Sequence, residues 1–223
     1  MKWLDTGREQ AAIDLSERLQ RELSGSKDVL WLLSGGSNIA TATRIMNLLP
    51  DDLTSHLTVS LVDERYGPIG HVDSNWGQLQ QAGFPAKQAR MLPVLHSDMG
   101  FEQTRDSYET MLKTSLANGN SVIALLGMGD DGHIAGILPH TIATEPTEAL
   151  IVAYHHQPYD RLTLSFSALQ ALTATYTFVF GESKKPPLTR LSTENLPLAE
   201  QPAQILKYLE DAYVYNDQVE EKL

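Results

Sequence analysis

The sequence predicts an α/β protein with a single doubly wound, mostly parallel sheet and helices on both faces. Two observations carry this prediction. Short apolar segments of strand length alternate along the chain with segments of helical periodicity. The strand segments are continuously apolar, which is typical of parallel strands buried on both faces. The expected architecture is Rossmann-like. No repeat or low-complexity linker divides the chain, so residues 1–223 are expected to form one domain.

Four segments have the pattern of helices. In the first, Ala12, Leu15 and Leu19 share one helical face, and Gly25 supplies a C-terminal stop. Pro50 ends the second helix, because proline disfavours the helical conformation of the residue before it. The third segment is amphipathic, and the fourth lies near the end of the chain. The expected helices are residues 7–23, 39–49, 101–116 and 201–209.

Six apolar segments are expected to be strands. They are rich in Val, Ile, Leu and aromatic residues. They occupy residues 28–33, 57–62, 121–126, 150–154, 161–166 and 175–180.

The composition is that of an ordinary globular protein. Of the 223 residues, 42% are hydrophobic and 20% are charged, and the formal net charge is −11. This charge argues against a nucleic-acid partner, since phosphate backbones are bound by clustered Lys and Arg. A small anionic ligand needs only a few local cations. The absence of cysteine excludes disulfides and thiolate metal ligands.

The sequence contains no signal for export or membrane insertion. The first five residues, MKWLD, reach an acid at once and include no apolar signal-peptide region. No apolar run approaches the ~20 residues that a membrane-spanning helix needs. We therefore expect a soluble, cytoplasmic protein without a membrane partner, of unknown oligomeric state.

The most informative motif follows the predicted strand 121–126. Residues 127–136 read GMGDDGHIAG, a glycine loop that contains His133. Glycines let the backbone approach a ligand, and ligands of open α/β sheets bind at the carboxyl ends of strands. His133 is a candidate general base, because histidine titrates near neutrality, and Asp131 is placed to orient it. The alternatives are a structural histidine and an aspartate that only caps the turn.

The same loop matches the G-x-G-x-x-G pattern of dinucleotide-binding proteins. Asp130 and Asp131 would put carboxylates where the pyrophosphate should lie, and no acid ends the next strand, at Tyr154, to bind the ribose. His155 and His156 lack a second group of ligands at the spacing of a zinc site. We therefore expect neither a nicotinamide cofactor nor a metal.

A second glycine loop, Ser34-Gly35-Gly36-Ser37, joins strand 28–33 to helix 39–49. Its backbone N–H groups, together with the positive end of the following helix, would suit a phosphate. The alternative is a plain tight turn, and the motif alone leaves both interpretations open.

Charged and polar residues follow other predicted strands. Asp63-Glu64-Arg65 ends strand 57–62, and Asn75 lies in the next loop. Arg161 opens one strand, and Lys184 follows another. Each of these alone is compatible with a solvated loop. Beside a glycine-rich loop, however, Arg161 and Lys184 form the sparse set of cations that an anionic sugar requires.

These motifs together resemble the blocks of the 6-phosphogluconolactonase/glucosamine-6-phosphate isomerase superfamily. The resemblance spans residues 8–210 and is strongest in the GMGDDGH block. The blocks, in chain order, are residues 34–37 (SGGS), 63–65 (DER) with 73–75 (DSN), 127–135 (GMGDDGHIA), 161–164 (RLTL) and 181–184 (GESK).

The resemblance also distinguishes the two chemistries of the superfamily. The isomerase/deaminase branch has Asp-Glu-Tyr where this chain has Arg65 in the third position, and a glutamate before the proline that follows the histidine motif. Here that position is Leu138, before Pro139. The resemblance therefore implies the lactonase branch. Asn38 and Ile39 replace the Thr-Pro usual in lactonases, which leaves the exact substrate specificity open.

The resemblance implies hydrolysis of 6-phospho-D-glucono-1,5-lactone, without metal or cofactor. His133 would activate water, Arg65 would stabilise the oxyanion, and Asp63 and Asn75 would contact the substrate. The amides of residues 34–37, with Arg161 and Lys184, would hold its phosphate.

Two other functions remain as alternatives. One is that of an isomerase/deaminase-like sugar-phosphate enzyme, and the other is that of a non-catalytic regulator that binds a sugar phosphate. The regulators of the superfamily usually carry an N-terminal DNA-binding helix pair. This chain opens on its first domain helix and is acidic, which disfavours the regulator.

Overall fold

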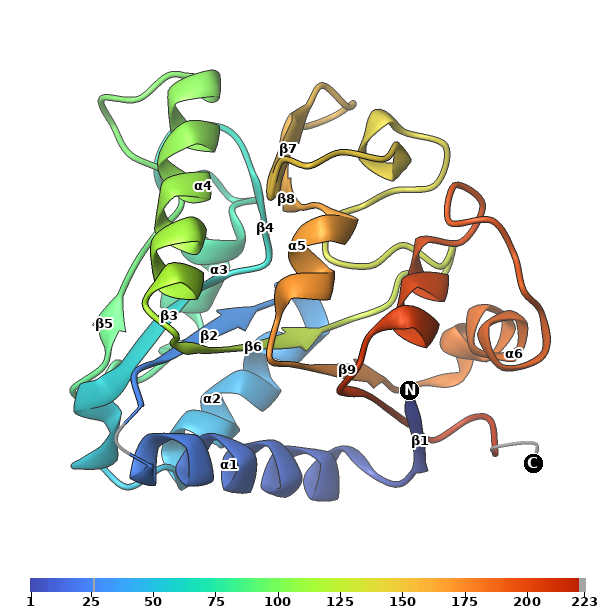
Figure 1. Cartoon of the computed structure of the whole chain (residues 1–223), viewed down its shortest axis with the longest axis horizontal. Coiled ribbons are helices and arrows are strands. Elements are labelled where there is room, and N and C mark those ends of the chain that lie inside the picture. The colour runs from blue at the N-terminus through green and yellow to red at the C-terminus, as the bar shows by residue number, and fades with distance from the viewer. Residues whose placement is uncertain (26, 221–223) are drawn as a thin grey trace.

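In a computed structural model of the protein, seven parallel strands form the central sheet (Figure 1). The structure describes residues 1–25 and 27–220, so Ser26 and residues 221–223 of the expected domain lie outside it. The α/β class and the parallel sheet are confirmed. From edge to edge the strands are β1 (Lys2–Asp5), β10 (Ala212–Asn216), β9 (Ala174–Val179), β6 (Ser121–Leu126), β2 (Val29–Leu33), β3 (Leu57–Leu61) and β5 (Arg90–Met91).

Helices cover both faces of this sheet. Figure 1 shows α1 and α2 on one side and α4 and α5 on the other. The face that α1 turns to the sheet carries Leu15 and Leu19, which are completely buried, as its periodicity predicts. The helices are α1 (Arg8–Ser24), α2 (Ile39–Leu48), α3 (Asn75–Gln81), α4 (Phe101–Ala117), α5 (Phe166–Ala171) and α6 (Lys185–Thr193).

Three strands form a second, antiparallel sheet in the order β4-β8-β7. They are β4 (Asp63–Arg65), β8 (Arg161–Leu164) and β7 (Ile151–Tyr154). Two of the predicted strands, 150–154 and 161–166, therefore belong to this sheet and not to the central one. The sequence pattern did not indicate this, since an apolar run shows that a strand is buried but not which strand it pairs with.

Several boundaries differ from the prediction for local reasons. The strand expected at residues 161–166 ends at Leu164, because the side chain of Ser165 accepts a hydrogen bond from Ala168 N and starts α5. Residues 202–208 form a 3₁₀ helix where an α-helix was expected. Five consecutive residues of it are buried, so the segment is enclosed rather than laid on a surface by one apolar face.

The strand order places a topological switch point between β2 and β6. From β2 the chain adds β3 and β5 on one side, and it then returns to build β6, β9 and β10 on the other. Diverging connections at such a point leave a crevice at the carboxyl ends of the two central strands. This edge of the sheet is therefore where a ligand site is expected.

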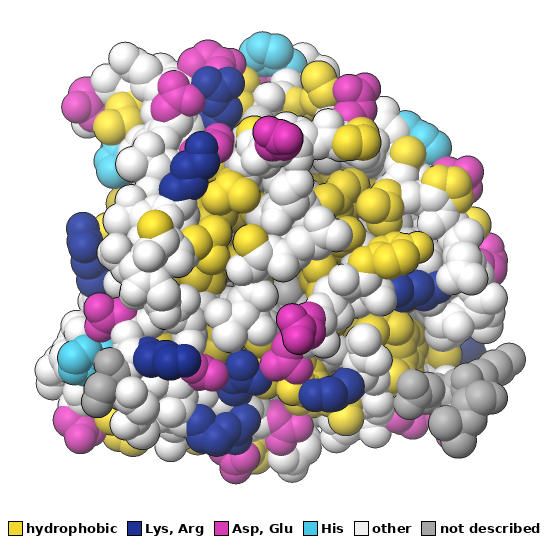
Figure 2. Space-filling model, viewed as in Figure 1, with side chains coloured by type: hydrophobic (Ala, Val, Ile, Leu, Met, Phe, Trp, Pro, Cys, Tyr) yellow, Lys and Arg dark blue, Asp and Glu magenta, His cyan; other side chains and the backbone are white. Residues whose placement is uncertain are grey.

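None of the helices in the described ranges combines the length and the apolar character needed to cross a bilayer. On the face drawn in Figure 2, basic and acidic side chains are interspersed along the lower edge, over α1. Hydrophobic side chains gather nearer the middle of that face, between the helices.

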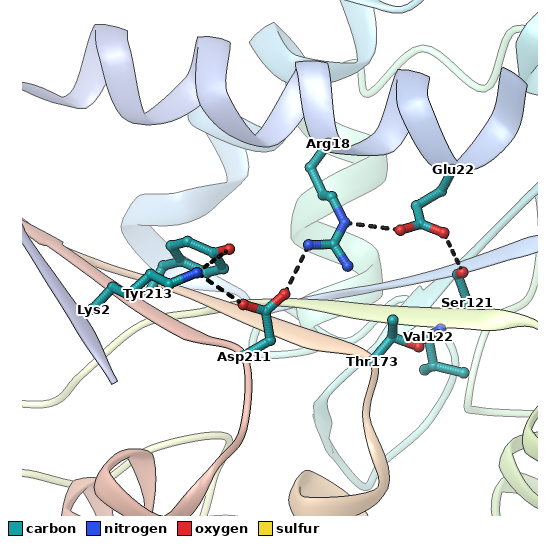
Figure 3. A network of polar contacts seen from close by, with 8 residues as sticks. All are labelled: Lys2, Arg18, Glu22, Ser121, Val122, Thr173, Asp211 and Tyr213. Atoms are coloured by element: carbon teal, nitrogen blue, oxygen red, sulfur yellow. Dashed lines mark hydrogen bonds and ion pairs between the residues drawn. The ribbon is translucent and has the colours of Figure 1, made fainter. Parts of the chain in front are cut away.

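A polar network at the opposite, amino-terminal edge of the strands fastens α1 to the sheet (Figure 3). Arg18 donates from Nε to Glu22 at 2.9 Å and from Nη1 to Asp211 at 2.8 Å. Glu22 also accepts a hydrogen bond of 2.6 Å from the hydroxyl of Ser121, the first residue of β6. Lys2 of β1 lies 3.4 Å from Asp211. The network thus joins both ends of the chain to its middle.

The acids of this network are ionised in the folded state over most of the pH range. Burial raises the pKa of Asp211, but the hydrogen bonds from Arg18, Tyr213 and Lys2 and the charge of Arg18 together outweigh burial, and the net pKa is lowered. Burial likewise raises the pKa of Glu22, while Ser121 and Arg18 lower it below its ordinary value. A lowered pKa means that the ionised acid stabilises the fold above the pKa of the unfolded chain, about 4.

We expect Arg18→Met to lower the free energy of unfolding by roughly 2–3 kcal/mol at pH 7, because two half-buried carboxylates lose their partner. The difference from the parent should shrink below about pH 4, as both acids become protonated. Urea denaturation at pH 7 and pH 3 measures both quantities. A loss of stability that is the same at the two pH values would contradict this account.

Arg44→Met is the control, since the ion pair of Arg44 with Glu9 is exposed (51% and 60%). It should change the free energy of unfolding by less than about 0.5 kcal/mol.

Candidate active site

The register of three neighbouring strands brings three loops to one place. Leu33 of β2 pairs with Leu61 of β3 on one side and with Leu125 of β6 on the other. The ladder continues one residue further, with Ser34 N donating to Leu125 O at 3.0 Å and Val62 N to Leu33 O at 2.9 Å. The chain segments that follow β2, β3 and β6 therefore emerge side by side.

A cavity of about 230 Å³ lies between these segments. It is smaller than the ~300–1,000 Å³ typical of sites for drug-sized ligands, as suits a smaller molecule. Every site residue predicted from the sequence lines it, except Asp131, which contacts the lining residue His133. The predicted residues in the lining are Ser34, Gly35, Gly36, Ser37, Asp63, Arg65, Asn75, His133, Arg161 and Lys184.

The first glycine loop leads from β2 into a 3₁₀ turn at residues 36–38 and then into α2. Among the described residues, no side chain of the capping position covers the start of the turn or of the helix, so backbone N–H groups at this end remain available to a ligand. Gly35 has no room for a Cβ, which would overlap Oδ1 of Asn75. The hydroxyl of Ser34 accepts a hydrogen bond of 3.2 Å from Gly127 N and so links this loop to the second one.

His133 and Asp131 form a hydrogen-bonded pair. Nδ1 of His133 lies 2.7 Å from Oδ1 of Asp131, which also accepts the backbone N–H of His133 at 3.0 Å. Burial raises the pKa of Asp131, but these two bonds, the charge interaction with His133 and a bond to its own backbone N–H together outweigh burial and bring the pKa to about 2. Asp131 is therefore ionised at neutral pH and only accepts, so Nδ1 carries the proton. Nε2 is left free to accept a proton from another molecule.

Gly129 makes room for this pair. A Cβ at Gly129 would overlap the imidazole of His133 and approach the carboxylate of Asp131. Any larger residue there would rotate the histidine out of its place.

Two arginines face each other across the second sheet. Arg65 of β4 is directly opposite Arg161 of β8, so both side chains lie on one face, and both line the cavity. Arg65 donates from Nη1 to Asp73 O at 2.8 Å. The Nε atoms of both are buried without a hydrogen-bond partner among the described residues. Like charges placed opposite each other destabilise a sheet, and an anion bound between them would remove this cost.

Lys184 enters the cavity already paired. Its Nζ lies 2.6 Å from Oδ1 of Asp130, which also accepts a hydrogen bond of 3.3 Å from the hydroxyl of Ser183. The hydrogen bond from Lys184 lowers the pKa of Asp130 below its ordinary value. An anionic ligand that binds Lys184 must therefore compete with Asp130.

Two buried asparagines complete the polar wall. Asn75 donates from Nδ2 to Asp63 O at 2.9 Å, and Asn38 donates to Leu126 O at 3.0 Å. The Oδ1 atom of each has no hydrogen-bond partner within the part of the chain that the structure describes. Asn38 drew attention in the sequence only as a departure from the lactonase pattern, yet it too lines the cavity.

Sequence reasoning missed Arg8. It donates from Nη1 to Ser37 O at 3.3 Å and to Thr41 Oγ1 at 3.4 Å, and its guanidinium lies 4.8 Å from the ring centre of Phe180. Arg8 thus supports the first glycine loop from outside. No sequence signal indicated this, since Arg8 sits in the first turn of α1, far along the chain from the loop that it contacts.

Within the described parts of the chain, no group of three or more His, Cys, Asp or Glu side chains is placed to hold a metal ion. The sequence-based expectation of a site without metal or cofactor stays a prediction.

Residues 5–214 match the protein family described as glucosamine-6-phosphate isomerases/6-phosphogluconolactonase. The chain belongs to this family. Over 198 residues it is 31% identical to a 6-phosphogluconolactonase of Pseudomonas aeruginosa, an alignment that covers 84% of this chain and 79% of that relative. It is also 30% identical over 179 residues to one of Helicobacter pylori, covering 78% of this chain and 76% of that one.

Solved structures share the fold. A 6-phosphogluconolactonase of Shewanella baltica superposes with a TM-score of 0.78 at 23% identity, covering 96% of both chains. A monomeric glucosamine-6-phosphate deaminase also superposes with a TM-score of 0.78, at 20% identity, covering 97% of both. The fold is therefore common to proteins of both names, and the side chains of the site must separate the two chemistries.

The geometry predicts an anion site independently of any reaction. The parent protein should bind inorganic phosphate, and Arg161→Ala should weaken binding by roughly 10- to 150-fold, the value of a lost charge-assisted hydrogen bond of about 1.5–3 kcal/mol. Isothermal titration calorimetry measures the affinity. Arg105→Ala on α4, whose partners are Glu102 and Asp106, is the control and should leave binding unchanged. Equal affinities for parent and Arg161→Ala would rule out this anion site.

Proposed function

We propose that the protein hydrolyses 6-phospho-D-glucono-1,5-lactone to 6-phospho-D-gluconate, with His133 activating the water. The observation that carries the proposal is the presence in one cavity of a base held by a carboxylate and of two arginines whose Nε atoms have no partner among the described residues. Relatives that are 30–31% identical over most of their length bear the lactonase name. A lactone phosphate needs both features, since one end must react and the other must be held.

The first chemical step is attack by water on the lactone carbonyl. Nε2 of His133 takes a proton from the water as its oxygen bonds to the carbonyl carbon, and Asp131 stabilises the imidazolium that forms. The carbonyl oxygen becomes an oxyanion, which the guanidinium of Arg65 stabilises. The tetrahedral intermediate then collapses, the bond from carbon to the ring oxygen breaks, and His133 returns the proton to that oxygen. The product is the open-chain acid.

The phosphate is held by a second group of donors in the same cavity. The amides of Gly35, Gly36 and Ser37, at the start of the turn leading into α2, supply N–H donors, and Arg161 and Lys184 supply charge. The amide of Ser34, which the sequence also suggested, already donates to Leu125 O. Asp63 and Asn75 contact the sugar hydroxyls. These contacts exist before and during the reaction, so they contribute mainly to substrate binding.

The second candidate is deamination of glucosamine 6-phosphate, which the shared fold favours. Two side chains count against it. Leu138 stands where the deaminase branch is expected to carry a glutamate, and Arg65 stands where that branch has a tyrosine. An apolar side chain at 138 cannot exchange a proton during ring opening.

The deciding assay compares two substrates. Freshly generated 6-phosphogluconolactone should be hydrolysed well above its spontaneous rate, and glucosamine 6-phosphate should release no ammonia. The reverse result would establish the deaminase. Binding of both compounds without turnover of either would indicate a regulator. Location in the cytoplasm and the absence of a nucleic-acid partner stay predictions, and neither affects this assay.

His133→Ala should lower kcat by about 10²–10⁴-fold, the usual contribution of a general base. Its affinity for 6-phosphogluconate should stay within about twofold of the parent's, because uniform binding contacts are untouched. Steady-state kinetics and calorimetry measure the two quantities.

His56→Ala is the matched control for this variant. His56 forms a similar pair, 3.1 Å from Asp28, at the amino-terminal edge of the strands. It should keep the parent's kcat. Turnover near the parent's in His133→Ala would make His133 a structural residue.

Substitution of the two members of the Lys184–Asp130 pair should change KM for the phosphorylated lactone in opposite directions. Lys184→Ala should raise KM for the phosphorylated lactone by about tenfold, with a smaller change in kcat. Asp130→Asn should lower KM, since the phosphate no longer competes with a carboxylate for the ammonium group. Both variants are compared on gluconolactone with and without the phosphate. A Lys184→Ala enzyme that keeps the parent's preference for the phosphorylated lactone would show that Lys184 does not bind the phosphate.

A further inference from the structure

Glu64 is a completely buried acid that the proposed mechanism does not use. Its Oε1 accepts the backbone N–H groups of Arg65 at 2.8 Å and Asn75 at 2.7 Å. Its Oε2 accepts the hydroxyl of Ser74 and the backbone N–H of Trp76, both at 3.0 Å. One carboxylate therefore receives four hydrogen bonds, from donors on both sides of the loop 66–73.

Two of these four donors belong to residues of the candidate site. Arg65 and Asn75 both line the cavity, and Oε1 of Glu64 holds their backbones on a single atom. With its backbone held, each of the two side chains is oriented by one further hydrogen bond. Arg65 donates from Nη1 to Asp73 O, and Asn75 donates from Nδ2 to Asp63 O. The position of both groups therefore depends on Glu64.

The loop between the two anchored residues has no apolar anchor of its own in its exposed part. Ile69 and Val72, which could have packed against the core, are 61% and 74% exposed. At its start the loop is also held by Tyr66, whose ring packs against Phe101 and whose N–H donates to Asp160 O at 2.8 Å. Beyond Tyr66 it depends on polar contacts, and those of Glu64, which join its two ends, are buried and short. Removing Glu64 would thus break the link between the two ends of the loop.

Only an ionised carboxylate suits this position. It offers acceptors on both oxygens and no donor, whereas a glutamine would turn an NH₂ group towards two of the donors. Burial raises the pKa of Glu64 above its ordinary value, although the hydrogen bonds from Trp76, Arg65, Asn75 and Ser74 oppose that rise. Burying a charge in this way is costly, and the cost is compensated where the charge organises a site.

We propose that Glu64 is a positioning residue that sets the guanidinium of Arg65 and the amide of Asn75 for lactone hydrolysis. The kinetic part of the proposal rests on the proposed function. The claim that Glu64 fixes the positions of Arg65 and Asn75 does not rest on it.

Glu64→Gln should lower kcat/KM for the phosphorylated lactone by about 100-fold, the order expected when a site group moves by roughly 1 Å. Glu22→Gln is the matched control. Glu22 is a partly buried carboxylate held by an arginine and a serine, and it lies at the opposite edge of the sheet. It should lower the melting temperature and leave kcat/KM unchanged. An equal loss of kcat/KM in both variants would reduce Glu64 to a stabilising residue.

A double-mutant cycle tests whether Glu64 acts through Arg65. In an Arg65→Ala background, Glu64→Gln should lower kcat/KM by only about threefold, because the group that it positions is already gone. The same fold loss in both backgrounds would overturn the proposal. If Glu64→Gln does not fold, Ser74→Ala takes its place in the cycle. It removes one donor to Oε2, together with the acceptor that caps α3 at Gly77 N. It should cost kcat/KM about fivefold and should lose that effect in the Arg65→Ala background.

A crystal structure of Glu64→Gln, or of Ser74→Ala if Glu64→Gln does not fold, separates this proposal from the proposed function. The guanidinium of Arg65 and the amide of Asn75 should move by about 1 Å relative to residues 34–37. If the parent protein fails to hydrolyse the lactone but this displacement is seen, the proposed function is wrong and the positioning role stands. If the parent is active and the two side chains keep their places in the variant, the positioning role is wrong and the function stands.

Discussion

The site depends on one constraint, the shared register of β2, β3 and β6. Because Leu33 is level with both Leu61 and Leu125, the three strands end at the same height and their loops start together. A slip of one residue in any of them would turn its side chains to the other face of the sheet and separate those loops. Burial of these apolar strands on both faces is what prevents the slip. The packing of the buried strands therefore fixes the relative positions of the loops that form the candidate site.

A second consequence follows from the point where the chain leaves the central sheet. After Val62 it turns into β4, whose partner β8 is antiparallel, and this pairing puts Arg65 opposite Arg161. The arrangement gathers positive charge in a protein whose formal net charge is −11. The net charge of the chain therefore does not indicate whether a local site prefers an anion or a cation.

Acids are present around the cavity as well, and each of three carboxylates there has a definite partner. Asp130 pairs with Lys184, Asp131 holds His133, and Glu64 accepts backbone N–H groups. Because these carboxylates are engaged by groups of the protein, they do not repel an anionic ligand as free carboxylates would.

The sequence predicted the parts of the molecule that repeat a simple period. The buried strands around residues 29–33 and 121–126 and the apolar face of α1 are of this kind. All the predicted site residues except Asp131 line one cavity. The second sheet could not be predicted, because the residue pattern of a strand does not indicate which strand it pairs with. Strands β1 and β5 are short edge strands with exposed residues, so they lack the apolar run that reveals a strand. Arg8 contacts residues far along the chain, and such contacts leave no motif. Glu64 lies in the DER block, but the block does not indicate that this carboxylate accepts the N–H groups of Arg65, Asn75 and Trp76.

The same fold serves proteins named as lactonases and as a deaminase, so the difference between them must lie in a few side chains. Both proposed reactions need a base beside a bound sugar phosphate, and the His133–Asp131 pair with the first glycine loop meets that need. Ring opening of an amino sugar also needs an acid that can exchange a proton, and the family resemblance puts the apolar Leu138 at that position. In the proposed mechanism, lactone hydrolysis needs instead a cation near the carbonyl oxygen, and Arg65 is the proposed cation. Under this proposal the choice between the two chemistries depends on the side chains at positions 138 and 65, on a fold that is shared.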